Sequence, residues 1–438
     1  MIKRLQFRSF FGLLIVLTLS FSPLIAQVDD DLTEKTKNLF NNLKAIEQSN
    51  NVLFGQEFFN SFAFSSGSAH GNETTSDAKT VTGSHPAVLG SDFHYYLDKD
   101  ATERGYHTDA VKWAFQQGYV ITFDWHISAR GTASYEYTAA NADLVPNIVN
   151  PSDASGDRDW FFDELDKIIE IINEDLVVGE DTIPIVLRPW HEMNGGWFWW
   201  GSNGATAAQY KELYKISVEY IKARTRTVLF CWSPNTPFGD ARYPGDDYVD
   251  VVGVDIYEAT TTSLRTELGK VVDFADAHNK IAVLSETGDR NNGVTSPLYW
   301  KNVILPGILD DPSGKSKKIA WMLTWINASW SVQYVAHSAS STEVKQSFIS
   351  FKNSANVVFG DESEMPDMYS PFVPVSAEDE LAENALQIFP NPSGDKLTIR
   401  SVGVEKFSTV RIFNTTGQLT HNIPDFKREV TLNAKEIL

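Results

Sequence analysis

The chain has 438 residues with 37 basic and 57 acidic side chains, which gives a formal net charge of −20. An acidic protein repels phosphate backbones, which argues against nucleic acid as a partner, and 42% hydrophobic residues exclude a mainly disordered chain. The single cysteine, Cys231, excludes an intramolecular disulfide framework and a cysteine-based zinc cage.

Residues 1–26 have the pattern of a secretory signal peptide. Lys3 and Arg4 supply the charged start, an apolar run covers 10–19, and Ala26 is the small residue before the expected cut. No later segment is long and apolar enough to span a bilayer. The sequence therefore predicts an exported protein without a membrane span.

Short apolar runs alternate with longer amphipathic stretches between about residues 51 and 355, and Phe161–Glu174 and Ala207–Lys222 are the clearest predicted helices. The predicted strands are 52–56, 87–92, 120–125, 183–190, 228–232, 251–257, 281–286 and 319–325. Continuously apolar strands are typical of a parallel sheet covered on both faces, and eight β/α units favour an α/β fold of the (β/α)8 TIM barrel type. An open doubly wound sheet is the alternative, but no glycine fingerprint follows an early strand.

Nearly every predicted strand ends in a polar or aromatic residue. These strand-end residues include Gln56, Asp92, His126, Glu192, Trp232, Tyr257, Glu286 and Trp325. Barrel enzymes place their chemistry at the C-terminal ends of the strands, so these side chains are expected to meet at one mouth.

The strongest local feature is LRPWHEMNGGWFWWG at 187–201, which opens at a strand end with His191 and Glu192. So many indole rings in one loop would expose a large apolar patch unless they line a ligand cleft. The pair His-Glu begins a zinc-protease motif, but Gly195 stands where the second histidine is required, so that motif is rejected. A serine-hydrolase GxSxG motif is also missing from the sequence.

A second carboxylate, Glu286, ends the predicted seventh strand, whereas Glu192 follows the fourth. Strands four and seven lie on opposite sides of a barrel mouth, so the two acids can face each other across it. Carboxylates about 5–5.5 Å apart are what a retaining glycosidase needs, one as acid/base and one as nucleophile.

These motifs together resemble glycoside hydrolase family 26, clan A, whose best-known members are endo-β-1,4-mannanases. The matching stretches are RPWHEMNGGWFWWG at 188–201, ITFDWH at 121–126, WSPN at 232–235, VVGVDIY at 251–257, VLSETG at 283–288 and WMLTWIN at 321–327. The resemblance implies that Glu192 is the acid/base and Glu286 the nucleophile. The residues expected to bind substrate or support the acids are His126, His191, Trp197, Tyr257, Trp325 and Arg188.

After residue 360 the composition changes. Residues 361–383 are acidic and proline-containing, which predicts a linker after a catalytic domain at 27–360. The runs FPNPSGDKLTI and RIFNTTGQL predict a small all-β appendage with strands at 396–400 and 410–414. This module, 384–438, resembles the C-terminal sorting domain of type IX secretion and is expected to lack its last strand. A generic β appendage is the alternative.

The sequence thus predicts a secreted or surface-located retaining endo-β-1,4-mannanase that acts on mannan, glucomannan or galactomannan without a cofactor or metal. Mixed-linkage β-glucan or β-1,3-xylan remain alternative substrates on the same fold. A non-catalytic glycan-binding protein and a purely structural surface protein are alternatives from other classes. Residues 126–158 are a candidate lid over one end of the cleft.

Overall fold

The computed structural model describes residues 28–29, 31–64, 74–290, 298–328 and 331–371, together with five strands between 386 and 433. The chain divides into two compact units, residues 1–371 and 372–438. The predicted signal peptide and the predicted linker from 372 to 383 lie outside the described residues.

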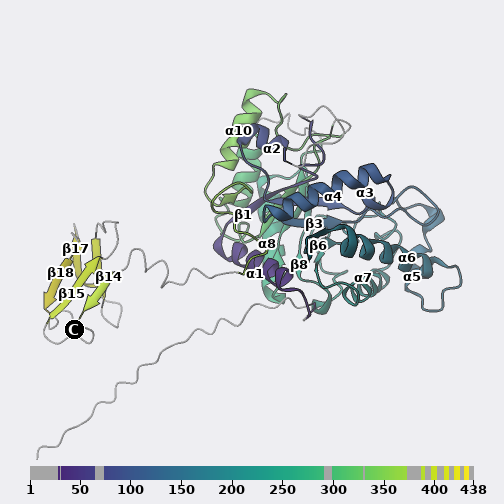
Figure 1. Cartoon of the computed structure of the whole chain (residues 1–438), viewed down its shortest axis with the longest axis horizontal. Helices are drawn as coiled ribbons and strands as arrows, with labels where there is room; N and C mark the ends of the chain where they lie inside the picture. The colour runs from purple at the N-terminus through teal and green to yellow at the C-terminus, as the bar shows by residue number, and fades with distance from the viewer. Residues whose placement is uncertain are drawn as a thin grey trace, which may run out of the picture. The chain divides into compact units, whose positions relative to one another are not determined.

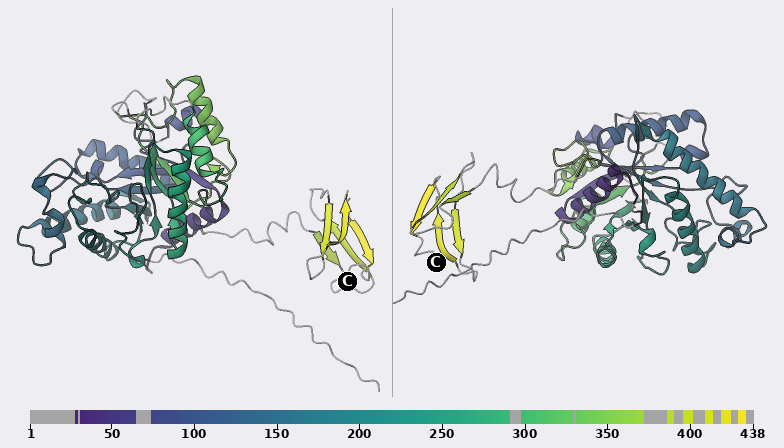
Figure 2. Two further views of the ribbon diagram at one scale, coloured as in Figure 1. Left: turned by 180° about the vertical axis from the view of Figure 1, so that it is seen from behind. Right: turned by 60° about the horizontal axis from the view of Figure 1, so that its bottom comes forward.

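Parallel strands in the first unit form a closed ring with eight positions, because each strand pairs with the next around the ring. Figures 1 and 2 show these strands in the interior of the unit, among its helices. The undivided positions are β1 (Val52–Glu57), β2 (Val88–Asp92), β3 (Val120–Asp124), β6 (Ile185–Arg188), β7 (Val228–Trp232) and β12 (Trp321–Thr324). The sixth position consists of β8 (Val251–Val252) and β9 (Asp255–Tyr257), and the seventh of β10 (Ile281–Ala282) and β11 (Leu284–Gly288). β8 pairs with β7, β9 pairs with β11, and β12 joins β11 to β1, so the predicted TIM barrel is confirmed.

Helices cover the outside of this ring (Figure 1). They are α1 (Glu34–Ser49), α2 (Asp77–Thr82), α3 (His94–Leu97), α4 (Ala101–Gln116), α5 (Leu144–Val149), α6 (Asp157–Glu170), α7 (Ala207–Lys222), α8 (Thr261–His278), α9 (Leu305–Ile308) and α10 (Thr342–Lys352). Shorter turns are η2 (Ala139–Asn141), η3 (Ile171–Asp175), η4 (Asp246–Tyr248) and η6 (Trp300–Ile304), and β4 (Val177–Val178) pairs with β5 (Asp181–Thr182) as a hairpin. None of the described helices combines the length and apolarity needed to cross a membrane.

Local sequence accounts for the helix boundaries. α7 begins at Thr206, whose side chain forms a reciprocal capping box with Gln209, and it ends where it was predicted. The predicted helix 161–174 is α6 followed by the π-helical turn η3, because the apolar pattern continues through Ile171 and Ile172 after the α-helical bonding ends.

The core fills the space inside the ring and between the ring and the helices. All six residues of β1 and all five of β2, β3 and β7 are buried, as a sheet covered on both faces requires. Trp199, Trp200 and Trp232 are fully buried and serve as packing. The indole rings of the 187–201 motif therefore divide between core and mouth.

The two ends of the first unit are tied together. The short strand β13 (Val357–Val358) pairs with β1, and the Asn42 side chain donates to the carbonyls of Met368 and Ser370 at 3.1 and 2.9 Å. Tyr119 on the barrel donates to Asp361 at 2.8 Å. Residues 361–371, at the start of the predicted linker, thus make specific contacts with the barrel.

The second unit contains two antiparallel groups of strands. β14 (Leu386–Phe389), β15 (Lys396–Ser401) and β18 (Glu429–Asn433) form one sheet, and β16 (Thr409–Phe413) pairs with β17 (Leu419–Pro424). The predicted strands at 396–400 and 410–414 correspond to β15 and β16. The small all-β appendage is confirmed.

Candidate active site

Arg188, the last residue of β6, is buried at the C-terminal mouth and connects four strands. Its Nη1 donates to Asp255 Oδ2 at 3.0 Å, and its Nη2 donates to Asp124 Oδ2 at 3.1 Å and to Glu286 Oε1. Burial alone would lower the pKa of Arg188, but the three carboxylates outweigh it and raise that pKa well above its usual value. One permanent cation thus fixes acids from β3, β9 and β11.

Glu286 lies in β11 and is buried, with a hydrogen bond to each carboxylate oxygen. Arg188 donates to Oε1, and the Tyr257 hydroxyl, from the end of β9, donates to Oε2 at 2.7 Å. Two donors on one carboxylate, one of them a cation, fix its orientation. This environment suits a nucleophilic carboxylate.

Glu192 follows β6 and is surrounded differently. The Trp197 indole N–H donates to Oε2 at 2.8 Å, and the Asn235 amide donates to Oε1 at 2.6 Å. Burial raises the pKa of Glu192, and the nearby charge of Glu286 raises it further. This environment suits an acid that must hold a proton at neutral pH.

The two acids are 94 positions apart in sequence but meet at the mouth. Glu192, Asp255 and Glu286 each place a carboxylate oxygen within 4.8 Å of those of the other two. This proximity of oxygen atoms fits the carboxyl separation of about 5–5.5 Å that a retaining glycosidase needs.

The loop after β6 holds Glu192 in an uncommon backbone conformation. Trp190 and Glu192 have φ angles of 55° and 53°, in the left-handed region that non-glycine residues rarely adopt. The Glu192 backbone N–H donates to the Ser233 carbonyl at 2.9 Å, which helps to keep this conformation. Strain of this kind is found where a side chain must be aimed at a ligand.

The predicted lid contacts this loop directly. The Tyr137 N–H donates to the Trp197 carbonyl at 2.6 Å, and the Trp199 N–H donates to the Tyr135 carbonyl at 3.2 Å. Trp197 is 44% exposed while its indole N–H donates to Glu192. The segment after β3 therefore helps to position Trp197.

His126 and His191 lie side by side next to the acids, with ring centroids 4.6 Å apart. His126 Nδ1 donates to Asp92 Oδ2 at 2.8 Å and lies 3.7 Å from Asp124 Oδ2. Burial alone would raise the pKa of Asp92, but His126 outweighs it and lowers that pKa. Burial also lowers the pKa of His191 well below its usual value, which leaves a neutral ring.

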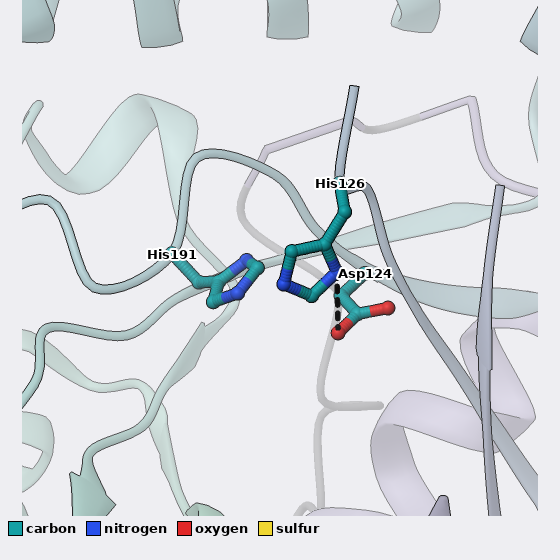
Figure 3. A group of neighbouring side chains, drawn as sticks. All are labelled: Asp124, His126 and His191. Atoms are coloured by element: carbon teal, nitrogen blue, oxygen red, sulfur yellow. Dashed lines mark ion pairs between the residues drawn. The ribbon is translucent and has the colours of Figure 1, made fainter. Parts of the chain in front are cut away.

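Two groups at the mouth have the residue types of a metal site. Asp124, His126 and His191 place ligand atoms within 4.8 Å of one another. In Figure 3, however, Asp124 faces Nδ1 of His126 whereas His191 lies at the opposite edge of that ring. The Nδ1 atom of His126, which is the ring nitrogen nearest Asp124, already donates to Asp92 at 2.8 Å. The second group consists of Glu192, Asp255 and Glu286. Asp255 and Glu286 already accept hydrogen bonds from Arg188.

Aromatic side chains extend the mouth on the side of β1 and β12. Trp325, directly after β12, is half-buried against a cluster that contains Phe58 and Phe62. The His126 and Trp325 ring centroids are 6.0 Å apart. All eight predicted site residues are therefore at the mouth.

Sequence reasoning missed four residues that contact or surround the predicted acids: Asp92, Asn235, Glu57 and Arg290. Asp92 was recognised only as a strand end, although it fixes the His126 ring. Asn235 is the last residue of the WSPN motif, which could have identified it. Glu57 and Arg290 lie outside the stretches that resemble the family, although Arg290 comes two residues after VLSETG.

Glu57, at the end of β1, is a buried carboxyl whose Oε1 has no hydrogen-bond partner among the described residues. Gly90 leaves it room, since a Cβ there would overlap Glu57 Oε2. Burial raises the pKa of Glu57 well above its usual value, Arg188 opposes this, and Glu286 and Asp92 add to it. Because the pKa of Glu57 is higher in the folded than in the unfolded protein, the neutral acid stabilises the folded state fully below the unfolded-state pKa of about 4.3. This contribution to the free energy of unfolding is lost as the pH rises through the folded-state pKa.

Glu57→Gln is isosteric with the neutral acid and cannot ionise. We therefore expect its free energy of unfolding to fall less steeply with pH than that of the wild type above about pH 4.3. Urea unfolding of both proteins at a series of pH values measures this. Glu212→Gln, on the exposed face of α7, is the control and should leave the pH dependence unchanged. Parallel curves for wild type and Glu57→Gln would show that Glu57 is ionised.

Comparison with known proteins agrees with the motifs. Residues 28–303 match the family model described as Glycosyl hydrolase family 26, and residues 387–437 match the model described as Secretion system C-terminal sorting domain. Both resemblances predicted from the motifs are confirmed.

Individual relatives carry a consistent description. A Mannan endo-1,4-beta-mannosidase of Bifidobacterium adolescentis is 30% identical over 331 residues, which cover 68% of this chain but only 32% of that protein. One from Bacillus subtilis (strain 168) is 27% identical over 330 residues, 70% of this chain and 83% of that protein. The solved Cellulomonas fimi endo-beta-1,4-mannanase double mutant gives a TM-score of 0.70 at 26% identity, over 93% of this chain and 94% of that chain.

Proposed function

Because this chain belongs to glycosyl hydrolase family 26, we propose that it is a secreted retaining endo-β-1,4-mannanase acting on mannan, glucomannan or galactomannan. The observation that carries the proposal is the meeting of Glu192 and Glu286, with carboxylate oxygens within 4.8 Å and unlike surroundings. The mannanase relatives support the choice of substrate.

In the first step Glu286 attacks the anomeric carbon while Glu192 gives its proton to the departing glycosidic oxygen. The hydrogen bonds from Arg188 and Tyr257 hold and orient the attacking carboxylate. Burial keeps the proton on Glu192 until the leaving oxygen takes it.

In the second step Glu192, now ionised, takes a proton from water, which attacks the glycosyl ester of Glu286 and releases a product of retained configuration. The Asn235 and Trp197 hydrogen bonds hold both oxygens of Glu192 in place through this exchange. His126, His191, Trp197 and Trp325 surround the sugars on either side of the cleaved bond in this proposal, with the histidines suited to hydroxyls and the indoles to pyranose faces.

A panel of polysaccharides tests the substrate, with ivory-nut mannan, glucomannan, galactomannan, mixed-linkage β-glucan and β-1,3-xylan in one reducing-sugar assay. We expect release of manno-oligosaccharides from the first three, and NMR of the first product should show the β anomer. A first product with the α anomer would contradict the mechanism, and cleavage of only the last two glycans would contradict the substrate.

The sorting domain supports export through type IX secretion to the medium or the cell surface. We expect removal of 384–438 to leave the enzyme in the periplasm with unchanged specific activity, since the barrel is a separate compact unit. Activity measured in periplasm and medium for the full chain and the shortened chain checks this. Equal export of the two proteins would contradict the role of the tail.

A further inference from the structure

Arg290 is an exposed cation four residues beyond the predicted nucleophile, in the segment that follows β11. Its guanidinium carbon lies 3.7 Å from the centroid of the Tyr257 ring. It forms no ion pair with any carboxylate in the part of the chain that the structure describes. A guanidinium over the face of an aromatic ring is attracted by the quadrupole of that ring.

The backbone around Arg290 is fixed by its neighbours. Glu258, directly after β9, has a φ of 48°, and its N–H donates to the Gly288 carbonyl at 3.0 Å. The Glu258 carboxylate in turn accepts from the Arg290 N–H at 3.2 Å. The segments that follow β9 and β11 are thus joined at the point from which the guanidinium reaches the ring.

Tyr257 is held from a second direction by Tyr334, whose ring centroid is 6.1 Å away at an angle of 67°. Tyr334 packs on the backbone of Gly288, where a Cβ would overlap its ring. The Tyr257 hydroxyl meanwhile donates to Glu286 Oε2 at 2.7 Å. Three contacts therefore fix one phenol, and Arg290 is the only cation among them.

We propose that Arg290 is a positioning residue for the glycosidase reaction: its guanidinium, stacked on Tyr257, holds and polarises the phenol that donates to Glu286. A cation over the face of a phenol draws electron density from the ring, which makes the hydroxyl a stronger hydrogen-bond donor. A stronger donor on Oε2 stabilises the carboxylate that leaves when the glycosyl ester is hydrolysed. This inference rests on the proposed function.

Arg290 also influences the other acid. Its positive charge lowers the pKa of Glu192, against the raising effects of burial and of Glu286, and Arg188 acts in the same direction as Arg290. Removal of the charge should therefore raise the pKa of Glu192, so that the acid stays protonated to higher pH. A merely structural role for Arg290 would not move this limb of the pH profile.

The first test compares Arg290→Met and Arg290→Lys with the wild type on a manno-oligosaccharide, or on whichever β-glycan the wild type cleaves. We expect Arg290→Met to lower kcat about tenfold without raising KM, and to shift the basic limb of the profile upward. Arg290→Lys keeps a cation and should remain within about threefold of the wild type. Arg224→Met is the matched control, because Arg224 stacks on Tyr220 at 3.4 Å on the outside of the barrel.

The Tyr257→Phe background isolates the pathway, because it keeps the ring and removes the hydroxyl. If Arg290 acts through that hydroxyl, Arg290→Met should lower kcat by less than about twofold in the Tyr257→Phe background. An equal loss in both backgrounds, or a rise in KM with unchanged kcat, would overturn the inference and make Arg290 a direct contact of the substrate.

A crystal structure of Arg290→Met supplies a readout that needs no substrate. We expect the Tyr257 hydroxyl to have left its 2.7 Å position on Glu286 Oε2. An unchanged hydroxyl position together with unchanged kcat would refute the positioning role. Because this comparison does not depend on which glycan is cleaved, it distinguishes failure of this inference from failure of the proposed function.

Discussion

Glu286→Ala is expected to lower kcat on β-mannan by roughly 10⁴- to 10⁶-fold, the range seen when a nucleophile is removed. Asp255, whose carboxylate lies near both acids, is not free to replace it, because it already accepts from Arg188 and Ser285 at 3.0 and 2.6 Å. The initial rate on a soluble mannan, with thermal unfolding to confirm the fold, measures the effect.

Azide provides a positive test of the same role. In Glu286→Ala the space left by the carboxylate can admit azide, which should attack an activated aryl β-mannoside from that face and give an α-mannosyl azide. Glu212→Ala, on the exposed face of α7, is the control and should keep wild-type activity. A Glu286→Ala protein that retains more than a few per cent of the activity would contradict the assignment.

Glu192→Ala should lower the rate on mannan by about 10²- to 10⁴-fold, because general-acid assistance to the leaving group is lost. A dinitrophenyl β-mannoside needs no such assistance, so its first step should proceed at close to the wild-type rate. The basic limb of the pH profile reports the raised pKa of Glu192 and should disappear in this variant. For the wild type and Glu192→Ala, stopped-flow measurement of dinitrophenol release gives the rate of the first step, and steady-state hydrolysis gives the rate on mannan.

An equal loss on both substrates would assign Glu192 to substrate binding instead. Asn235→Ala offers an intermediate case, since it removes one of the two hydrogen bonds to Glu192 and leaves the carboxyl itself. We expect Asn235→Ala to lower the rate on mannan by about tenfold, less than Glu192→Ala does.

The fold was accessible from sequence because buried parallel strands are continuously apolar. Every predicted strand corresponds to a position in the ring, to within a few residues. The breaks inside the sixth and seventh strands, at Gly253–Val254 and Val283, were not predicted, since their sequence is as apolar as the strands themselves. The packing of neighbouring strands, rather than the local sequence, determines where the hydrogen bonding between these strands is interrupted.

The site was predictable where a residue type and a strand end coincide, as for Glu192 and Glu286. Arg188 was expected to bind substrate or support the acids, but its contacts with acids on three other strands depend on closure of the ring. Arg290 and Glu57 were missed for the same reason, because their partners lie on other strands and no local pattern marks them. The tryptophans of the 187–201 motif could not be divided from sequence, because the same indole-rich run supplies buried core residues and the exposed Trp197 at the mouth.

The tie between the two ends of the barrel has a consequence for its assembly. β1 lies between β2 and β12, and the side-chain amides of Asn38 and Asn42 on α1 donate to carbonyls of residues 368–370. The earliest and latest parts of the unit therefore complete one another. The ring therefore closes only after the ribosome has made nearly the whole unit. For the same reason a circular permutation that joins these ends, with new termini opened at the exposed 312–313 turn, should preserve every strand pairing.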